Sequence, residues 1–482
     1  MKKTPLRFLI AVLALTIAAS FPGCAGRKTG VPIPSDQSAS LWVVTEETIS
    51  NGMNQQAQTL IDQFTSTYPN VSIQLEILPT EDGERSARLS ELYSLIDAGN
   101  GPDIYLLPTY DVLTLEHPEK YTYKRIAPLI PDVNIAMRKG IFLDISQWYK
   151  KDRDLNKNNL NQTVMDAGIV GTARYALPLR YNVPVMYVWG DYFQENGVNE
   201  EIVRSGIGAW MEYVTQKGDP VLACSGEYIS TWAFTDLIDY DSNEVILTRE
   251  TARRYLALSQ SVQALIGGEV RHRSATDIMP YIFGHWTPFP AQAGILRSAM
   301  GYAAVAKAES EALAMYPLPT MEGDYIATVE YYGAIGRDCT DPELAYEFIR
   351  LFLQEESQWE QNREKSEDSP YWGLAERGWP VRTKGSVAPL WENYRKTALG
   401  NFSGDAQTPE RQEKILSLEL TDSDIPILET KIDFARFPAY TSTKIAAITS
   451  KLTDWENGSA PTDADLDMLA DELISVLQSS LG

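Results

Sequence analysis

The chain has 482 residues and a net charge of −23, and 44 % of its residues are hydrophobic and 22 % are charged. A chain of this length can build more than one hydrophobic core, and its proportions of hydrophobic and charged residues are those of a folded globular protein. A surface this acidic repels phosphate backbones, which argues against nucleic acid as a partner. With three cysteines, three histidines and no HExxH or CxxC pattern, the sequence excludes a disulfide framework and predicts neither a metal site nor a cofactor.

The first 23 residues have the pattern of a signal peptide. Three basic residues precede an apolar run over 8–19, and small residues follow it. About a dozen apolar residues fit the hydrophobic part of a signal peptide and are short for a membrane-spanning helix. Residues 24–40 are small, polar and proline-containing, which predicts a flexible tether. No later run is long and apolar enough to cross a bilayer, so we expect a folded body outside the cytoplasm.

The leader ends at Cys24, and this end resembles the lipidation site of bacterial lipoproteins. In that class the cysteine becomes the first mature residue and carries the lipids, including palmitate. Phe21 and Pro22 depart from the usual leucine and small residue. Ordinary cleavage near Gly23 or Gly26, without lipid, is the alternative.

The folded body begins with alternating strand and helix patterns. Apolar or alternating runs over 41–45, 71–78 and 104–108 predict three strands. Apolar residues at helical spacing predict a helix after each of the first two strands. They are Met53, Ala57, Leu60, Ile61 and Phe64 in the first helix, and Leu89, Leu92 and Ile96 in the second. This order and these lengths predict a parallel sheet with right-handed crossovers.

Two later helices are predicted from their ends and their apolar stripes. In "TDPELAYEFIRLFL", Thr340 or Asp341 can cap the helix and Pro342 suits its first position. The stripe expected to face the core comprises Leu344, Ala345, Phe348, Ile349 and Phe352. Near the end of the chain, Leu466, Leu469, Leu473 and Leu477 form the same kind of stripe.

The order of these motifs resembles the extracellular solute-binding proteins, family 1, the sugar-capturing subunits of ABC importers. The matching motifs are "FTSTYPN", "GNGPDI", "GIFLDISQWYKKD", "ARYALPLRYNVPVMYVWGDYF", "GAWMEYV", "ALAMYPLPTMEGD" and "GAIGRDCTDPELAYEFIRLFLQEESQ". In "GAWMEYV", Gly208 and Ala209 stand where the family usually has a polar cap. The resemblance extends from about Leu41 to Val381, and each motif is weak when taken alone.

The resemblance implies an α/β protein with the two-lobed periplasmic-binding-protein type II fold, a hinge and a ligand cleft between the lobes. Residues 41–180 with 333–370 would form the first lobe, and 183–330 with 372–482 the second. We place the chain crossings near Leu179–Val183 and Val329–Gly333, with a third near Ser369–Leu374. The lobes would close around a ligand by rotation at these crossings.

Candidate ligand-binding residues in the first lobe follow the carboxyl ends of its strands, where open parallel sheets bind ligands. They are Glu46, Glu47, Tyr110 and Asp111, with Arg180, Tyr181 and Asn182 at the first crossing. Glu46 and Glu47 are equally typical of charges at the start of a helix. Arg180 is equally typical of a structural ion pair.

Candidates in the second lobe and at the later crossings are mostly aromatic, because aromatic rings complement the apolar faces of sugars. They are Trp232, Asp236, Trp286, Tyr331, Tyr332, Trp372 and Trp379. Packing in the core or at the hinge is the alternative for each aromatic residue. If the strand at the second crossing alternates, Tyr331 or Tyr332 points toward the ligand.

The resemblance implies a monomeric, lipid-anchored binding protein that captures a carbohydrate and delivers it to the membrane permease of an ABC importer. A secreted glycosidase is one alternative, although no nucleophile motif stands out among the 65 acidic residues. The same fold without a transport partner, as a sensor feeder or surface adhesin, is another. Transport of an amino acid, peptide or polyamine is a third. Cys224 and Cys339 could form one disulfide or remain buried thiols.

Overall fold

The computed structural model describes residues 38–47, 52–109, 112–117, 122–189, 193, 198–218, 237–240, 242–271, 289–292, 296–310, 313–321, 323–359, 378–383, 385–398, 409–425, 431–438 and 461–481. The predicted signal peptide, Cys24 and most of the predicted tether therefore lie outside the described residues. The predicted third crossing, Ser369–Leu374, and Cys224 lie outside them too.

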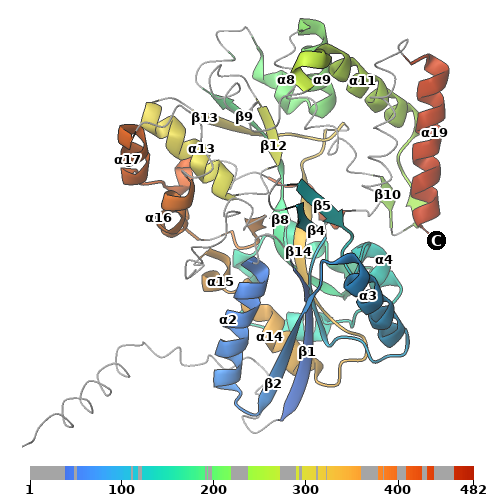
Figure 1. Ribbon diagram of the computed structural model, residues 1–482, viewed down its shortest axis with the longest axis vertical. Helices are drawn as coiled ribbons and strands as arrows, with labels where there is room; N and C mark the ends of the chain where they lie inside the picture. The colour runs from blue at the N-terminus through green and yellow to red at the C-terminus, as the bar shows by residue number, and fades with distance from the viewer. Residues whose placement is uncertain are drawn as a thin grey trace, which may run out of the picture.

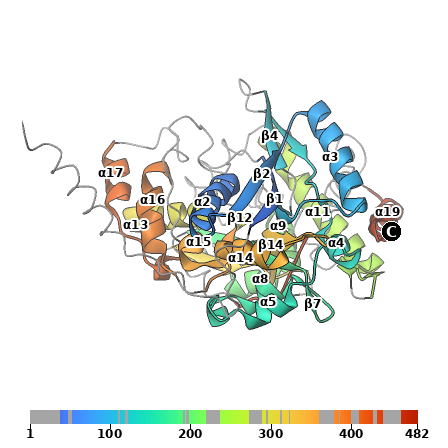
Figure 2. The ribbon, with the colours of Figure 1, turned by 90° about the horizontal axis from the view of Figure 1, so that it is seen from below.

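The opening β-α-β-α-β pattern is confirmed. Its elements are β1 (Ala39–Glu46), α2 (Gly52–Thr67), β2 (Val71–Leu78), α3 (Asp82–Asp97) and β3 (Ile104–Pro108). Strand β1 lies between β2 and β3 and is parallel to both. Figure 2 shows α2 on one side of β1 and β2 and α3 on the other. The predicted face of α2 is buried from Ala57 to Phe64, and Leu92 of α3 is fully buried.

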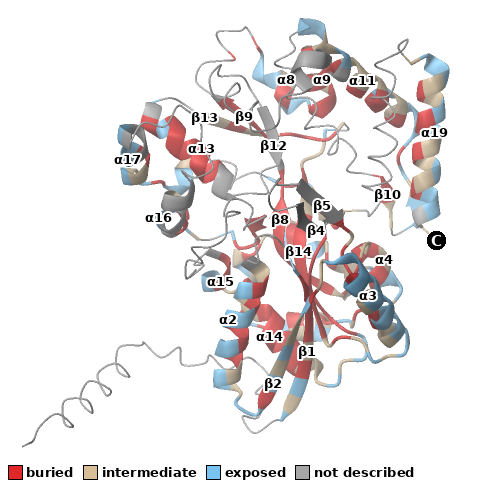
Figure 3. Cartoon of the chain, viewed as in Figure 1, coloured by how far each residue is buried: buried red, intermediate tan, exposed pale blue. Residues whose placement is uncertain are grey.

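Four later segments complete a seven-stranded mixed sheet, in the order β15-β8-β14-β3-β1-β2 with β16 beside β14. They are β8 (Ala176–Asn182), β14 (Ile326–Ile335), β15 (Trp379–Pro380) and β16 (Phe434–Arg436). Strand β14 is antiparallel to both β3 and β8, so β8 runs in the direction of β3. Figure 3 shows that β8 and β14 are mostly buried. Helix α14 (Pro342–Ile349) covers one face beside α2, where Phe348 meets Phe64 edge-on at 5.6 Å.

The second lobe is built on a smaller antiparallel sheet, β12-β9-β13. Its strands are β9 (Pro184–Trp189), β12 (Phe289–Gln292) and β13 (Leu313–Pro317). Helices α8 (Glu200–Arg204), α9 (Ile207–Lys217), α11 (Arg249–Arg271) and α19 (Asp463–Ser480) enclose a separate apolar cluster above it. All four predicted leucines of α19 are buried there, and a capping box between Thr462 and Asp465 starts the helix.

A third group of helices lies beside the junction of the lobes. Helix α13 (Leu296–Glu309) contacts α16 (Val387–Ala398) and α17 (Pro409–Ser417), and α16 contacts α15 (Glu355–Trp359) next to the first sheet. Apolar side chains of α13, α16 and α17 belong to the same continuous core as the seven-stranded sheet. Figure 1 shows this group on the left of the molecule, spanning the level at which the two sheets meet.

The remaining elements are short. The paired strands are β4 (Val112–His117) with β5 (Thr122–Ile126), β6 (Ile169–Val170) with β7 (Ala173–Arg174), and β10 (Ile238–Asp239) with β11 (Glu244–Val245). The short helices are α4 (Val133–Arg138), α5 (Ser146–Lys151) and α6 (Gln162–Asp166), with 3-10 turns at Lys157–Asn159, Arg350–Leu353 and Asp422–Asp424.

The chain changes from one sheet to the other at two described places. Between β8 and β9 the change occurs at Val183, and between β13 and β14 it occurs over 318–325. The second change comes earlier than the expected Val329–Gly333, because Thr328 and Val329 already pair with β8. The structure also differs from the expected extent of the second lobe, since β15 and β16 lie within 372–482 but pair with strands of the first sheet.

Replacing Leu473 by alanine should destabilise the second lobe strongly, because Leu473 is fully buried between α19 and its neighbours. We expect a loss of about 3 kcal/mol in the free energy of unfolding, typical of a large-to-small change in a core. Met468 lies on the same helix with 57 % of its surface exposed, and Met468→Ala is the matched control, expected to change stability by about 0.5 kcal/mol or less. Urea unfolding checks both variants, and equal losses would contradict the packing described.

Candidate functional site

The carboxyl ends of three strands of the first sheet meet at one edge. Strand pairing aligns Thr45 of β1 with Leu106 of β3, and Tyr331 of β14 with both Pro108 and Arg180. Strands β8 and β14 continue from this edge toward the second lobe, so the edge faces that lobe (Figure 1). We call this set of residues the carboxyl edge: Thr45, Glu46, Glu47, Thr109, Arg180, Tyr181, Asn182, Glu330 and Tyr331.

Glu46 is fully engaged inside the first lobe. Its carboxylate accepts hydrogen bonds from Arg85 at 2.8 and 3.1 Å and from the backbone N–H of Leu129 at 2.7 Å. Arg85 also donates to the carbonyl of Ala127 at 2.6 Å. The pair therefore fixes the segment that follows β5 to the end of β1. Glu47, the next residue, is exposed.

Arg180 joins β8 to α15. Its guanidinium donates to the carbonyl oxygens of Gln358 at 3.0 Å and Ser357 at 3.3 Å, at the end of that short helix. The side chain of Gln358 reaches back to the carbonyl of Leu179 at 3.2 Å and accepts from the N–H of Val381 at 2.8 Å. Arg180 is buried among these contacts, so it holds β8 against α15. We call β8 and β14, the two strands of the first sheet next to the sheet changes, the hinge strands.

Tyr181, Tyr332 and Trp379 belong to the aromatic core beneath the carboxyl edge. Tyr332 is fully buried, with ring centroids 5.9 Å from Phe142 and 5.5 Å from Phe437. Burial raises the pKa of Tyr181 to about 12, and Trp379 pairs with it on the neighbouring strand. Packing, the alternative considered for these aromatics, is what the structure shows for them.

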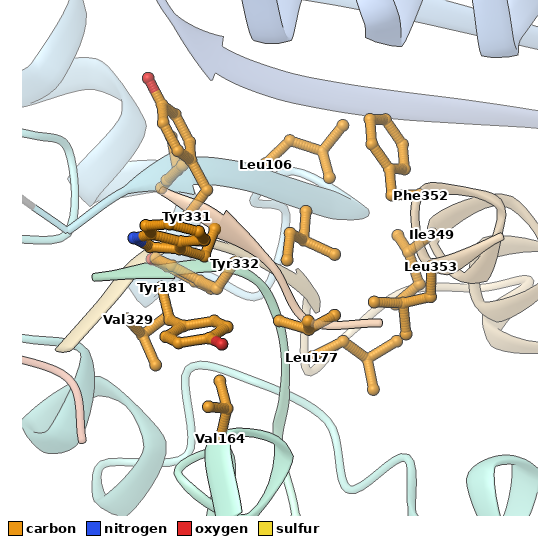
Figure 4. Close-up of a cluster of buried hydrophobic side chains, with 14 of the residues drawn as sticks. Leu106, Val164, Leu177, Tyr181, Val329, Tyr331, Tyr332, Ile349, Phe352 and Leu353 are labelled. Atoms are coloured by element: carbon orange, nitrogen blue, oxygen red, sulfur yellow. The ribbon is translucent and has the colours of Figure 1, made fainter. Parts of the chain in front are cut away.

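Tyr331 differs from Tyr181 in the direction of its ring. Figure 4 shows Tyr181 pointing toward Val164, whereas Tyr331 projects the opposite way from the hinge strands. The pairing of β14 with β8 shifts register on both sides of Tyr331, which marks an irregularity in the strand. Tyr331 is nonetheless 6 % exposed and contributes to the same core.

A buried polar pair lies where the two hinge strands leave the first sheet. The Asn182 side-chain N–H donates to the Glu330 carboxylate at 3.2 Å, and both residues are buried. The backbone N–H of Thr109, at the end of β3, donates to the Glu330 carbonyl at 3.0 Å. Among the residues that the structure describes, none donates a hydrogen bond to the buried Oδ1 atom of Asn182.

The sequence reasoning missed Glu330. One signal could have found it, because Glu330 is the one charged residue in the otherwise apolar run "IATVEYYGAI". A second polar pair lies at the end of β1, where Thr45 donates to Asn54 Oδ1 at 3.0 Å, and no described residue accepts a hydrogen bond from Asn54 Nδ2.

Several predicted site residues lie outside the described residues, so their predicted roles stay predictions. They are Tyr110, Asp111, Trp232, Asp236, Trp286 and Trp372. Among the residues that the structure describes, no group of three or more His, Cys, Asp or Glu side chains is placed to hold a metal ion. Cys339 is a free, half-buried thiol, and burial with nearby Asp103 raises its pKa to about 12.

No helix in the described part of the chain has both the length and the apolarity needed to cross a membrane.

No protein-family model and no curated protein sequence matches the chain. Among solved structures, the chain is similar to an extracellular solute-binding protein of family 1 from Alicyclobacillus acidocaldarius, with 15 % identity over 92 % of this chain and 99 % of the other, at a TM-score of 0.51. It is also similar to a periplasmic oligogalacturonide-binding protein from Yersinia enterocolitica, with 13 % identity, 92 % and 100 % coverage and a TM-score of 0.51.

A third similar structure is the galacto-N-biose/lacto-N-biose I-binding protein of an ABC transporter from Bifidobacterium longum, with 14 % identity, 92 % and 97 % coverage and a TM-score of 0.51. Two structures described as designed esterases give TM-scores of 0.51 and 0.53. At this identity the likeness shows the fold alone. The chain has the two-lobed fold of the extracellular solute-binding proteins, which confirms at the level of fold the resemblance found in the sequence motifs.

Replacing Glu46 by glutamine should destabilise the first lobe, because it leaves the buried Arg85 guanidinium without its counter-charge. Breaking a buried ion pair in this way costs about 3 kcal/mol. Glu47→Gln is the control, since its neighbouring carboxylate is exposed and should change stability by about 0.5 kcal/mol or less. Urea unfolding of both variants measures the difference. Equal stability of E46Q and wild type would contradict a structural role for Glu46.

Proposed function

We propose that this protein binds a small solute between its two lobes and delivers it to the permease of an ABC importer. The shared fold supports a solute-binding role, because the similar structures include two sugar-binding proteins, one of them from an ABC transporter. The chain path supports it as well, since the chain passes from one sheet to the other at Val183, between β8 and β9, and over 318–325, between β13 and β14. A ligand that contacts both lobes favours the closed arrangement.

The observation that carries this proposal is the buried Asn182–Glu330 pair at the hinge. A buried acceptor such as Asn182 Oδ1, which has no donor among the described residues, costs about 1–3 kcal/mol unless a water or a ligand supplies the hydrogen bond. A ligand hydroxyl could donate to Asn182 Oδ1 and restore the missing hydrogen bond. Because both residues sit on crossing strands, a ligand held there touches the part of the molecule that bends.

We propose a carbohydrate as the solute. Sugar hydroxyls both donate and accept hydrogen bonds, which suits a carboxylate beside an amide. The composition favours the same class, with 25 tyrosines and 11 tryptophans whose rings complement sugar faces. In the proposed site, Asn182, Glu330, Glu47, Tyr110 and Asp111 form the first-lobe wall. Trp232, Asp236 and Trp286 form the opposite wall, with Trp372 near the hinge.

We further propose that the protein is anchored by lipid on Cys24 at the outer face of the cell membrane. The apolar leader that stops at Cys24 supports this anchor, and the polar segment over 24–40 would hold the folded body away from the lipid surface. An anchored binding protein stays close to its permease. We propose that the protein is a monomer with one lipid-modified terminus.

Neutral oligosaccharides should raise the melting temperature of the protein, because a ligand that binds only the native state stabilises it by about 2.7 kcal/mol at a hundredfold excess over its Kd. A panel of oligosaccharides, polyamines and peptides in a thermal-shift assay makes the test. Asn182→Ala should reduce the shift, and Asn100→Ala, an exposed residue before β3, should leave it unchanged. Shifts with cationic compounds only would contradict the carbohydrate assignment, and product formation from an oligosaccharide would favour an enzyme.

Replacing Cys24 by serine should remove the lipid and release the protein from membranes into the soluble fraction. Mass spectrometry of the intact protein and fractionation of cells that produce it check the two expectations. A wild-type protein that is cleaved near Gly23 or Gly26 and carries no lipid would contradict the anchor without affecting the binding site.

A further inference from the structure

Tyr240 connects the two lobes. It follows β10, and its ring packs against the apolar cluster enclosed by α9, α11 and α19 in the second lobe. Its hydroxyl donates to Asp132 Oδ2 at 2.9 Å. Asp132 belongs to the first lobe, where its Oδ1 accepts from the backbone N–H of Ile135 at 3.0 Å and caps α4. One carboxylate therefore starts a helix in one lobe and holds a tyrosine from the other.

The surroundings of Tyr240 keep it a hydrogen-bond donor. The Arg138 guanidinium of α4 lies 5.9 Å from the centre of the Tyr240 ring. Burial and the adjacent Asp132 carboxylate raise the pKa of Tyr240, so its phenol stays protonated at physiological pH. A protonated phenol that donates to a carboxylate forms a charge-assisted hydrogen bond, which is stronger than a neutral one.

The contact lies on the side of the molecule away from the continuous apolar junction. That junction includes Tyr302 of α13, which meets Tyr187 of β9 at 4.9 Å, and Trp391 of α16. Figure 1 shows α13, α16 and α15 on the left, and β10 and α4 on the right. Apolar packing on the left resists separation, so a hinge rotation moves the lobes apart more readily where β10 meets α4.

The first-lobe partner is also fixed to the carboxyl edge. Asp132 stands three residues after Leu129, whose N–H donates to Glu46 at the end of β1. The contact therefore forms on the side of the first lobe that faces the second lobe. Because the contact joins the two lobes, a rotation that opens them at this side would separate Tyr240 from Asp132.

We propose that the Tyr240–Asp132 hydrogen bond is a tie that stabilises the closed arrangement of the lobes before and during ligand binding. This inference rests on the proposed solute-binding function. The tie increases the population of the closed arrangement, which is the one that binds the ligand. The apparent affinity rises in proportion to the population of that arrangement. The tie thus sets how tightly the protein binds without touching the ligand.

Small-angle X-ray scattering of the ligand-free full chain, carrying Cys24→Ser for solubility, tests the tie directly. Tyr240→Phe keeps the ring and removes the donor. Asp132→Ser keeps a good helix cap but is too short to reach Tyr240. We expect each variant to have a larger radius of gyration than wild type, and the double variant to be no larger than either single one, because all three lose the same bond. Tyr213→Phe is the control: it removes a hydroxyl from a ring stacked on Trp210 within the second lobe, and its radius of gyration should match that of wild type.

The affinity for the sugar that shifts the melting temperature should fall about tenfold in Tyr240→Phe, the effect of losing one charge-assisted hydrogen bond. An unchanged radius of gyration in Tyr240→Phe, or additive increases in the double variant, would overturn the tie. The scattering comparison needs no ligand, so it stands even if no sugar binds. Sugar binding that is equally tight in wild type and Tyr240→Phe would overturn the tie while leaving the proposed function intact.

Discussion

The pairing of β8 with β14 is the interaction on which the two-lobed arrangement depends. The two strands are antiparallel neighbours in the first sheet; β8 leads through Val183 into β9 of the second sheet, and β14 is reached from β13 of that sheet over 318–325. Their pairing fixes where along the chain path the two lobes meet, and it fixes the direction in which the carboxyl edge faces. The side chains that anchor this pair, Arg180 through α15 and Tyr332 through Phe142 and Phe437, are accordingly buried.

This constraint divides the residues of the carboxyl edge between two tasks. The side chains of Glu46 and Arg180 are hydrogen-bonded to other parts of the protein. These bonds fix the segment after β5 and the helix beside β8. Asn182 and Glu330 are hydrogen-bonded to each other at the hinge, and the Oδ1 acceptor of Asn182 has no donor in the described part of the chain. A rigid edge with a small unsatisfied polar group is the arrangement expected where binding energy must be converted into rotation of one lobe against the other.

The sequence alone was sufficient for elements whose pattern is local. The first β-α-β-α-β unit, the helix after Pro342 and the last helix all have apolar periodicity and end signals within themselves. The sequence predicted the burial of side chains less well in the outermost strand of the sheet. Strand β2 alternates from Val71 to Ile77, yet Ile77 is 46 % exposed, because β2 is the outermost strand of the sheet. Alternation shows that two faces differ and does not show which part of a face has a neighbour.

The sequence indicated where several residues of the carboxyl edge lie, but not which contacts they make. Glu46, Arg180 and Asn182 lie at one edge because β1, β3 and β8 run in the same direction and end there. Their partners are distant in sequence, 39 residues away for Arg85 and 178 for Gln358. No local pattern reveals such contacts, so a charge at a strand end looks the same whether it binds a ligand or a neighbouring helix.

The most direct test of the whole account is a crystal structure of the protein with the oligosaccharide that stabilises it most. The account predicts sugar density between the carboxyl edge and the β12-β9-β13 sheet, with a hydroxyl within hydrogen-bond distance of Asn182 Oδ1. Sugar bound on an outer face of either lobe, with Asn182 Oδ1 still unpartnered, would contradict it.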